Sequence, residues 1–139
     1  MVEYVFIDAS CGHLFQEIIG LYRAMGWWGE SPDDLAIVGS LVRGSHAFVA
    51  ALDGGEVIGM GRALSDRESD AYIQDVAVRA DRRGQGVGGE IVRRLVERLE
   101  GDGIGWIGLV AEPGAARIYE RLGFAQMLGA TPMLRRRPS

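Results

Sequence analysis

Apolar residues recur at helical spacing in two stretches of the first third of the chain. The first stretch predicts a helix that Ser10 caps and Gly26 ends, because serine is a favoured cap and glycine a favoured terminator. The second predicts a helix that opens at Ser31-Pro32 and stops at Gly44, since proline is tolerated at the first helical position. The apolar positions that define these helices are Leu14, Ile18, Leu21, Tyr22 and Met25, then Leu35, Val38, Leu41 and Val42.

Shorter apolar runs before and after these helices predict strands. Asp53-Gly54-Gly55 separates two of them and is typical of a tight β-hairpin turn. A glycine-rich segment then leads into a third helix, and Pro113 opens a fourth. The predicted strands are residues 2–7, 46–52, 56–64, 71–78 and 104–110, with one or two more short strands from Phe124 onward.

The order of these elements predicts the fold class. Two helices follow the first strand, three strands come next, and helices then alternate with strands to the end. Such a mixed order favours an α/β (α+β) fold whose sheet is mostly antiparallel but contains one parallel crossover. The expected sheet has six to seven strands and about four flanking helices, and residues 1–139 are expected to form a single domain.

Composition is that of an ordinary globular protein, with 47% hydrophobic and 24% charged residues. Cys11 is the only cysteine, so an internal disulfide is excluded and a reducing cytoplasm is the expected location. The apolar runs are too short to span a bilayer, so no membrane association is expected.

Charge and histidine content argue against two further classes. The net charge is −4, whereas a general nucleic-acid binder usually carries an excess of basic residues. The basic run at residues 135–137 fits a solvated tail. His13 and His46 are far apart and form no ligand pattern, so no metal site is predicted.

The segment from Gly84 to Gly89 matches G-x-G-x-x-G, the dinucleotide fingerprint, and Glu112 follows as an acidic residue. That fingerprint places its first glycine directly after a strand, usually in the first βα unit. Here residues 79–83 intervene, several elements come earlier, and the remaining chain is too short for a doubly wound sheet. The dinucleotide interpretation is therefore disfavoured.

A second pattern in the same segment is Arg83-x-x-Gly86-x-Gly88 between a strand and a helix. Glycine lets the backbone approach a pyrophosphate closely, and the unpaired amides of the first helical turn point at the anion. The helix dipole adds to this attraction, and Arg82 and Arg83 add positive charge. A turn that merely connects strand to helix is the structural alternative.

This second pattern resembles the central motif of the GNAT superfamily of N-acetyltransferases. The preceding strand, residues 73–78, resembles the family's core strand, and a segment ending in Tyr119-x-x-x-Gly123-Phe124 resembles its last conserved helix. Two separate matches are more specific than one, and the element order extends the likeness over nearly the whole chain. One departure is Glu112, which stands where many members carry an asparagine that contacts the pantetheine arm.

The resemblance implies direct transfer of the acetyl group of acetyl-CoA to a primary amine, on a small molecule or on a peptide. It also implies a sheet that splays between the predicted strands 71–78 and 104–110, with the pantetheine arm in the gap and the Val76 amide polarising the thioester carbonyl. Family members are often dimers, so a homodimer is possible. The implied cofactor-binding residues are Val76, Ala77, Val78, Arg83, Gly84, Gln85, Gly86, Val87, Gly88 and Gly89.

Two residues are expected to move protons. Asp75 is the expected base, acting directly or through water, because an alkylamine is protonated at neutral pH. Tyr119 is the expected general acid, since its phenol, with a pKa of about 10, can donate to the departing sulfur. A structural carboxylate at Asp75 and a packing role for Tyr119 are the alternatives.

The acceptor side is expected around Trp27 and Trp28, with plain packing as an equal alternative. Glu30, Asp33 and Asp34 lie next to them in the sequence, and aromatic faces with negative charge favour a cationic arylalkylamine. Acylation with a different acyl group is another possible activity. A CoA-binding sensor or interaction domain without catalysis is the non-enzyme alternative.

Overall fold

The computed structural model describes residues 1–29 and 32–137. The chain packs as two compact units, Met1–Leu109 and the residues from Val110 onward, which are described in turn. The interpretation of residues 1–139 as a single domain stays a prediction.

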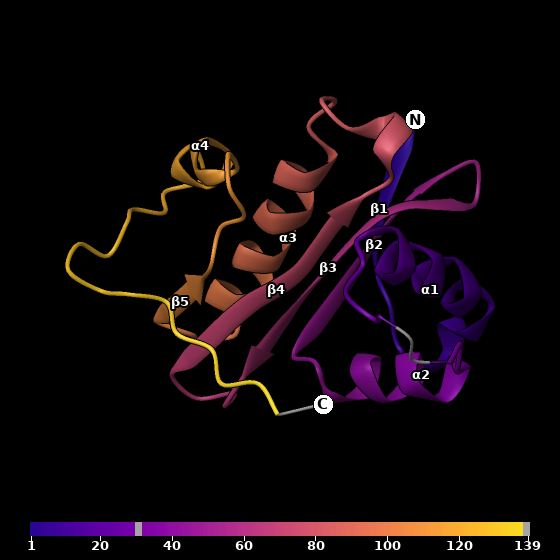
Figure 1. Ribbon diagram of the computed structural model, residues 1–139, viewed down its shortest axis with the longest axis horizontal. Helices are drawn as coiled ribbons and strands as arrows, with labels where there is room; N and C mark the ends of the chain where they lie inside the picture. Colours follow the sequence, from indigo (N-terminus) through magenta and orange to yellow (C-terminus); the bar gives the residue numbers. More distant parts are fainter. Residues whose placement is uncertain (30–31, 138–139) are drawn as a thin grey trace. The chain divides into compact units, whose positions relative to one another are not determined.

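The first unit is built on five strands: β1 Val2–Phe6, β2 Ala47–Asp53, β3 Glu56–Ser65, β4 Asp70–Val78 and β5 Trp106–Leu109. They form one sheet in the order β1-β2-β3-β4-β5 (Figure 1). Neighbours from β1 to β4 pair antiparallel, whereas β4 and β5 pair parallel. The mostly antiparallel sheet with one parallel crossover is therefore confirmed.

Three α-helices accompany this sheet: α1 Phe15–Ala24, α2 Leu35–Gly44 and α3 Val87–Gly101. Two short 3₁₀ segments, η1 Ala9–Leu14 and η2 Ala80–Arg82, precede α1 and α3. The predicted caps are wrong. Asp8 rather than Ser10 caps η1, and Asp34 caps α2 by accepting the N–H of Ala36 at 2.8 Å. Ser31, the cap expected for α2, lies outside the described residues.

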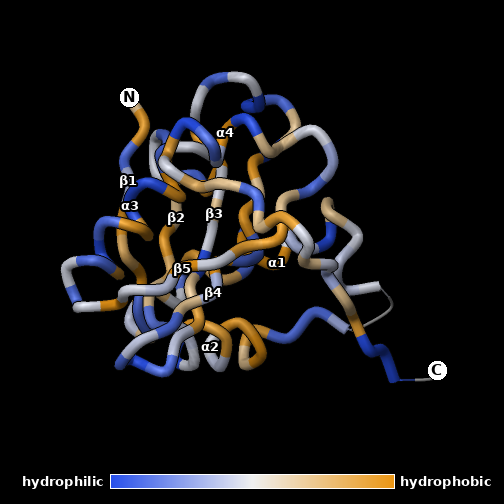
Figure 2. Tube along the Cα trace, turned by 90° about the vertical axis from the view of Figure 1, so that its left-hand side faces the viewer, coloured by the Kyte–Doolittle hydropathy of each residue, from blue (hydrophilic) through white to orange (hydrophobic). Residues whose placement is uncertain are grey.

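Helices cover both faces of the sheet in the first unit, with α1 and α2 on one face and α3 on the other (Figure 1). The helix α2 is hydrophobic along most of its length (Figure 2), and its buried residues Val38 and Val42 join a core cluster with α1 and β2. On the α3 face, β3 presents small residues that let the helix approach closely. A methyl group on Gly61 would lie only 2.6 Å from Ile91.

The second unit contains one short helix, α4 Ala116–Glu120. No strand forms among residues 124–137, so the expected extra strands are wrong and the sheet has five strands instead of six to seven. The physical reason is local. Gly129 has a φ of 84°, Pro132 lacks an N–H group, and the side chains of residues 125–137 are all exposed, without the alternation of a half-buried strand.

With α1 to α4 the expected number of helices is confirmed. Among residues 1–29 and 32–137, no helix is long and apolar enough to cross a membrane.

Candidate active site

The strands β4 and β5 are paired over only part of β4. Their last pair joins Ile73 to Leu109, whereas β4 continues to Val78. Within the described part of the first unit, the remaining residues of β4 have no strand partner on that side. The sheet therefore opens beyond Ile73, at the place where the resemblance implied that it would splay.

A β-bulge lies at this opening. The register of β3 and β4 shifts between Met60 and Arg62, so that Asp75 and Val76 together oppose Gly61. Asp75 has a φ of 58°, in the left-handed region that aspartate tolerates better than most residues. A residue held in this region beside a strand opening points to a functional site.

The bulge also changes which side chains share a face. Gln74 pairs with Arg62, and the side chain of Asp75 binds the same arginine, so two successive side chains lie on the α1 and α2 face. Val76 lies on the α3 face, since its Cγ2 is 3.3 Å from a Cβ built on Gly61. A regularly alternating strand would have put Gln74 and Asp75 on opposite faces, so the bulge changes the face on which Asp75 lies.

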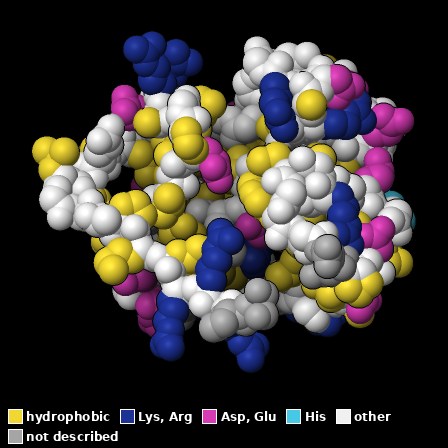
Figure 3. All heavy atoms as spheres, viewed as in Figure 1, with side chains coloured by type: hydrophobic (Ala, Val, Ile, Leu, Met, Phe, Trp, Pro, Cys, Tyr) yellow, Lys and Arg dark blue, Asp and Glu magenta, His cyan; other side chains and the backbone are white. Residues whose placement is uncertain are grey.

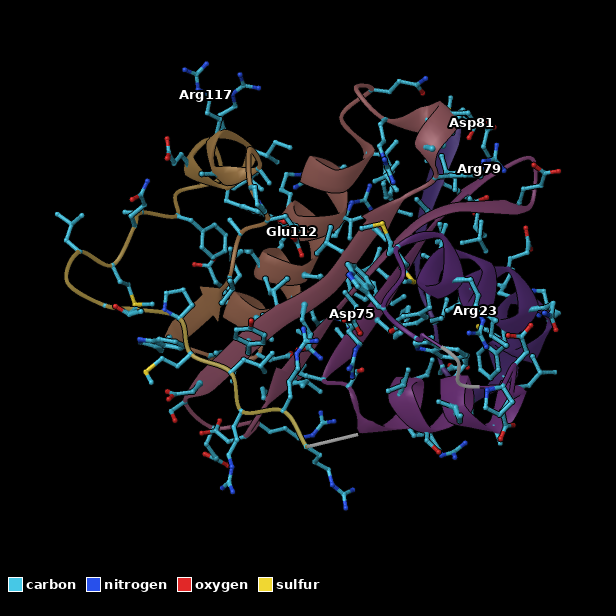
Figure 4. The ribbon with its side chains drawn as sticks, in the orientation of Figure 1. Arg23, Asp75, Arg79, Asp81, Glu112 and Arg117 are labelled. Carbon is cyan, nitrogen blue, oxygen red and sulfur yellow. The ribbon has the colours of Figure 1, made fainter. Side chains whose placement is uncertain are left out.

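Asp75 is held by two donors on a single oxygen. The hydroxyl of Tyr22 and the Nε of Arg62 each donate to Oδ2 at 2.7 Å. The Arg62 side chain is only 10% exposed and that of Asp75 20%. No residue within 1–29 and 32–137 donates a hydrogen bond to Oδ1 of Asp75. Figure 4 labels Asp75, which belongs to β4.

Tyr22 connects this carboxylate to the two tryptophans. Burial, followed by the negative charge of Asp75, raises the pKa of Tyr22 well above its usual range, so its hydroxyl remains a donor. Its ring stacks on Trp28 with centroids 5.0 Å apart and meets Trp27 edge-on at 6.2 Å. The structure thus brings Trp27, Trp28 and Asp75 into one cluster.

The two tryptophans differ in what surrounds them. Trp28 is partly buried, and the guanidinium of Arg23 lies 5.6 Å from its ring centre. Trp27 is 38% exposed. Because a cation already lies over Trp28, Trp27 offers the more accessible aromatic surface.

The acids expected beside the tryptophans have partners of their own. Asp33 forms an ion pair with Arg23 at 2.7 Å, and Asp34 caps α2. Glu30 lies outside the described residues. Asp75 differs from Asp33 in its burial, because its side chain is 20% exposed whereas that of Asp33 is 53% exposed.

The glycine turn brings unpaired amides to the start of α3. Gly86 has a φ of 82°, and its carbonyl accepts the first helical hydrogen bond, from the N–H of Glu90 at 3.1 Å. No described residue accepts a hydrogen bond from the amides of residues 86–89. A methyl group on Gly84 or Gly86 would meet no atom within 4 Å, so the turn borders open space. These features suit an anion at the helix N-terminus.

Arg83 links this turn to the end of β4. Its Nε donates to the carbonyl of Val78 at 3.1 Å. The N–H of Arg79 bonds to Ile58 on β3 at 2.8 Å, and successive residues of an antiparallel strand direct their backbone groups to opposite edges. The N–H of Val78 therefore faces the open edge of β4.

Several arginines around the sheet are already paired with acids. Arg82 bonds to Asp53 at 2.8 Å and Arg79 to Asp81 at 2.7 Å. In the face drawn in Figure 3, basic side chains are interspersed with acidic and hydrophobic ones. Much of the positive charge of the first unit is thus neutralised locally.

Tyr119 belongs to α4 in the second unit. Its ring packs edge-on against Phe124, with centroids 6.1 Å apart. Burial, followed by the negative charge of Glu112, raises the pKa of Tyr119, so the phenol keeps its proton over a wider pH range. These facts are compatible both with a proton donor and with a packing residue.

The sequence analysis missed Arg62 and assigned Tyr22 only to a helix core. Arg62 could have been found, because a charged residue surrounded by apolar ones within a strand needs a buried partner. Tyr22 offered no such signal, since a tyrosine at helical spacing is typical of packing. In the described residues, no group of three or more histidine, cysteine, aspartate or glutamate side chains is arranged to hold a metal ion.

Comparison with known families shows which family the chain belongs to. The model of the acetyltransferase (GNAT) family matches residues 12–124, which include the glycine turn, the bulged strand and Tyr119. The chain belongs to the GNAT acetyltransferase family. Enzymes of this family take their acetyl group from acetyl-CoA and act on amines.

Curated relatives are similar over part of their length. The chain is 42% identical over 69 residues to GCN5-related N-acetyltransferase 2 of Arabidopsis thaliana, covering 50% of this chain and 27% of that protein. It is 37% identical over 76 residues to serotonin N-acetyltransferase 2 of Oryza sativa, covering 55% and 38%. A match to histone acetyltransferase TAP1 of Glycine max is 39% identical over 93 residues, covering 63% and 38%. The chain thus spans less than half the length of these relatives.

Solved structures share the fold over almost the whole chain. Glucosamine-6-phosphate N-acetyltransferase of Arabidopsis thaliana has a TM-score of 0.81 at 16% identity, with 98% of each chain covered. A Trypanosoma brucei acetyltransferase has a TM-score of 0.78 at 18% identity, covering 96% of this chain and 99% of that one. At these identities the likeness establishes the fold alone.

Proposed function

We propose that this protein transfers the acetyl group of acetyl-CoA directly to a primary amine on a small molecule that carries an aromatic group. The observation that carries the proposal is the Asp75 cluster. A carboxylate with one unpaired oxygen lies where β4 parts from β5, and two tryptophans adjoin the tyrosine that holds it. A negative group beside aromatic rings suits a cationic, flat acceptor.

The first unit has features that fit acetyl-CoA. The unpaired amides of residues 86–89 suit the pyrophosphate, and the open edge of β4 at Val78 suits the amide groups of a pantetheine arm. Arg83 braces the carbonyl of Val78 rather than pointing freely into solvent, so we assign it to holding the turn in place. Acetyl-CoA supplies an activated acyl group as a thioester.

In the proposed reaction, the residues of this chain handle protons and charge. The acceptor nitrogen forms a bond to the carbonyl carbon and the bond to sulfur breaks, giving an amide and free CoA. Asp75 accepts the proton that the amine loses, directly or through water, and the amide of Val76 polarises the thioester carbonyl. Tyr119 donates a proton to the departing sulfur. The roles of Asp75, Val76 and Tyr119 follow from the family motif.

The acceptor class rests on the same cluster and on one relative. Serotonin, the substrate in the name of the Oryza sativa relative, is an arylalkylamine. A histone acetyltransferase is also among the relatives, which makes a lysine side chain the second acceptor to examine. We favour the arylalkylamine because the exposed Trp27 and the stacked pair of Tyr22 and Trp28 offer an aromatic site. A cytoplasmic location and a homodimer stay predictions.

The central prediction is that native protein releases CoA from acetyl-CoA in the presence of phenethylamine or tryptamine. We expect kcat/KM for these amines to exceed that for glucosamine 6-phosphate, because a phosphate is disfavoured next to the Asp75 carboxylate. Trp27→Ala should lower kcat/KM for phenethylamine by roughly ten-fold, the scale of losing one well-placed aromatic contact. A thiol-release assay measures kcat/KM for each of the three amines and for Trp27→Ala with phenethylamine.

Two results would contradict this acceptor assignment. One is a preference for glucosamine 6-phosphate that Trp27→Ala leaves unchanged. The other is acetylation of a histone-tail peptide alone. Binding of acetyl-CoA without turnover of any amine would instead support the sensor alternative. Turnover with another acyl-CoA but not with acetyl-CoA would support the alternative acyl group.

A second prediction concerns the glycine turn. Gly86→Val should weaken CoA binding at least ten-fold, because a side chain there blocks close approach of the pyrophosphate. Gly103→Val is the matched control, since Gly103 has a φ of 89° and equally open surroundings. Both variants should lose stability by about 1–2 kcal/mol from the left-handed backbone. Calorimetric titration with CoA tests this prediction, and equal affinities in the two variants would contradict it.

A third prediction concerns the proton donor. Tyr119→Phe should keep its affinity for CoA but lower kcat by roughly 10²-fold, the usual scale for a general acid. Tyr4→Phe serves as control, because Tyr4 lies on β1 against Arg94 and its hydroxyl has no role in the reaction. Steady-state kinetics under saturating acetyl-CoA give the comparison. Equal kcat in native protein and Tyr119→Phe would assign Tyr119 to packing against Phe124.

A further inference from the structure

The two oxygens of Asp75 have different surroundings. Oδ2 accepts hydrogen bonds from both Tyr22 and Arg62, each at 2.7 Å. Oδ1 accepts none from the residues that the structure describes, although the side chain is 20% exposed. An arginine facing a carboxylate usually engages both oxygens through its planar fork. Here a single guanidinium nitrogen, Nε of Arg62, bonds to Oδ2 alone, and the second hydrogen bond to that oxygen comes from Tyr22.

We propose that Tyr22 and Arg62 are positioning residues for the transfer reaction. They hold Asp75 through Oδ2 and thereby present Oδ1 to the nitrogen of the acceptor amine. This inference rests on the proposed function and deepens it, since it names the atom that receives the amine and the residues that aim it. Tyr22 and Arg62 act on the amine only through Asp75.

The backbone conformation at Asp75 also helps to fix the direction of its carboxylate. The left-handed backbone of Asp75 directs its side chain to the α1 and α2 face, and the bulge fixes that backbone against β3. Arg62 comes from the facing part of β3 and its Nη1 lies 3.4 Å from the Oγ of Ser45. Donors from α1 and from β3 therefore converge on one oxygen, which fixes the orientation of the other.

This arrangement has a defined chemical consequence. With Oδ2 occupied, an amine N–H can hydrogen-bond only to Oδ1, which restricts the direction of the nitrogen lone pair. As the carbon–nitrogen bond forms, the proton on nitrogen moves to Oδ1 or to a water bound there.

A purely structural role for the cluster is the competing explanation. A buried arginine within a strand needs a counter-charge whatever the protein does, and Asp75 supplies it. A structural role predicts loss of stability when the cluster is changed, with no selective effect on the amine. A positioning role predicts an effect on the amine that disappears once Asp75 can no longer act.

Tyr22→Phe is the most informative single change. It removes one hydroxyl group and keeps the ring that stacks on Trp28. It also leaves the ion pair of Arg62 and Asp75 in place, so folding is less at risk than with a change at Arg62. Tyr4→Phe is the matched control on the α3 face, where Tyr4 packs against Arg94.

The test is a double-mutant cycle of Tyr22→Phe and Asp75→Asn, measured with phenethylamine and acetyl-CoA. Tyr22→Phe alone should lower kcat/KM for the amine by roughly ten-fold or more, the scale of one hydrogen bond to a charged group, with KM for acetyl-CoA unchanged. In the Asp75→Asn background it should lower kcat/KM by less than about two-fold, because coupled residues are not additive. Tyr4→Phe should match the native protein.

Two results would overturn the inference while leaving acetyl transfer established. One is an unchanged kcat/KM in Tyr22→Phe, and the other is an equal Tyr22→Phe effect with and without Asp75→Asn. Arg62→Lys and Arg62→Met provide a second test when the two variants have similar Tm values. The lysine retains the positive charge, so Arg62→Lys should preserve more amine turnover than Arg62→Met. Absence of turnover with native protein would overturn the proposed function, and this inference with it.

Discussion

The site depends on a buried ion pair placed within a β-sheet. Arg62 lies in the middle of β3, surrounded by apolar neighbours, and its guanidinium must meet a negative charge because an unpaired buried charge costs several kcal/mol. In a regular strand, Gln74 would lie on the same face as Arg62 and the side chain of Asp75 would point to the opposite face. The bulge at Asp75 and Val76 solves this geometric problem by bringing Gln74 and Asp75 onto one face. The same bulge lies close to the point where β4 leaves β5, so the charge pair and the opening of the sheet are neighbours along one strand.

The rest of the first unit stabilises this arrangement from both faces. On one face, Tyr22 extends the ion pair into the core of α1 and α2 and carries the stacked Trp28. On the other, α3 packs closely against β3, and no side chain larger than that of Gly61 fits beneath Ile91. The packing of α3 against β3 and β4 also places its N-terminal amides near the end of β4. Asp75 thus lies within β4, and the glycine turn lies near the carboxyl end of the same strand.

Much of this fold could be predicted from the sequence, because hydrophobic periodicity and turn chemistry are local properties. The hairpin at Asp53-Gly54-Gly55, the parallel crossover and the glycine turn all follow from such patterns. The strands expected after Phe124 did not form, since a run of apolar residues does not ensure alternation or a partner. The caps at Asp8 and Asp34 were missed because several polar residues competed for each helix start.

The site was harder to predict than the fold. The motif identified Asp75, yet its partners Tyr22 and Arg62 come from elements far away in the sequence. Sequence spacing cannot reveal a bulge, and the bulge decides which face Asp75 joins. Only Arg62 could have been noticed in the sequence, as a charged residue in an apolar strand. Such a residue predicts a buried counter-charge, but the sequence does not show which residue supplies it.

The most direct measurement of the central claim is a crystal structure with a bisubstrate analogue, in which the sulfur of CoA is linked through an acetyl group to the nitrogen of phenethylamine. The account predicts that the pantetheine arm lies along the open edge of β4 and that the amide nitrogen is within about 3.2 Å of Oδ1 of Asp75. Tyr22 and Arg62 should remain on Oδ2. An analogue bound with its nitrogen away from Asp75, or with Oδ1 contacted only by protein groups, would contradict it.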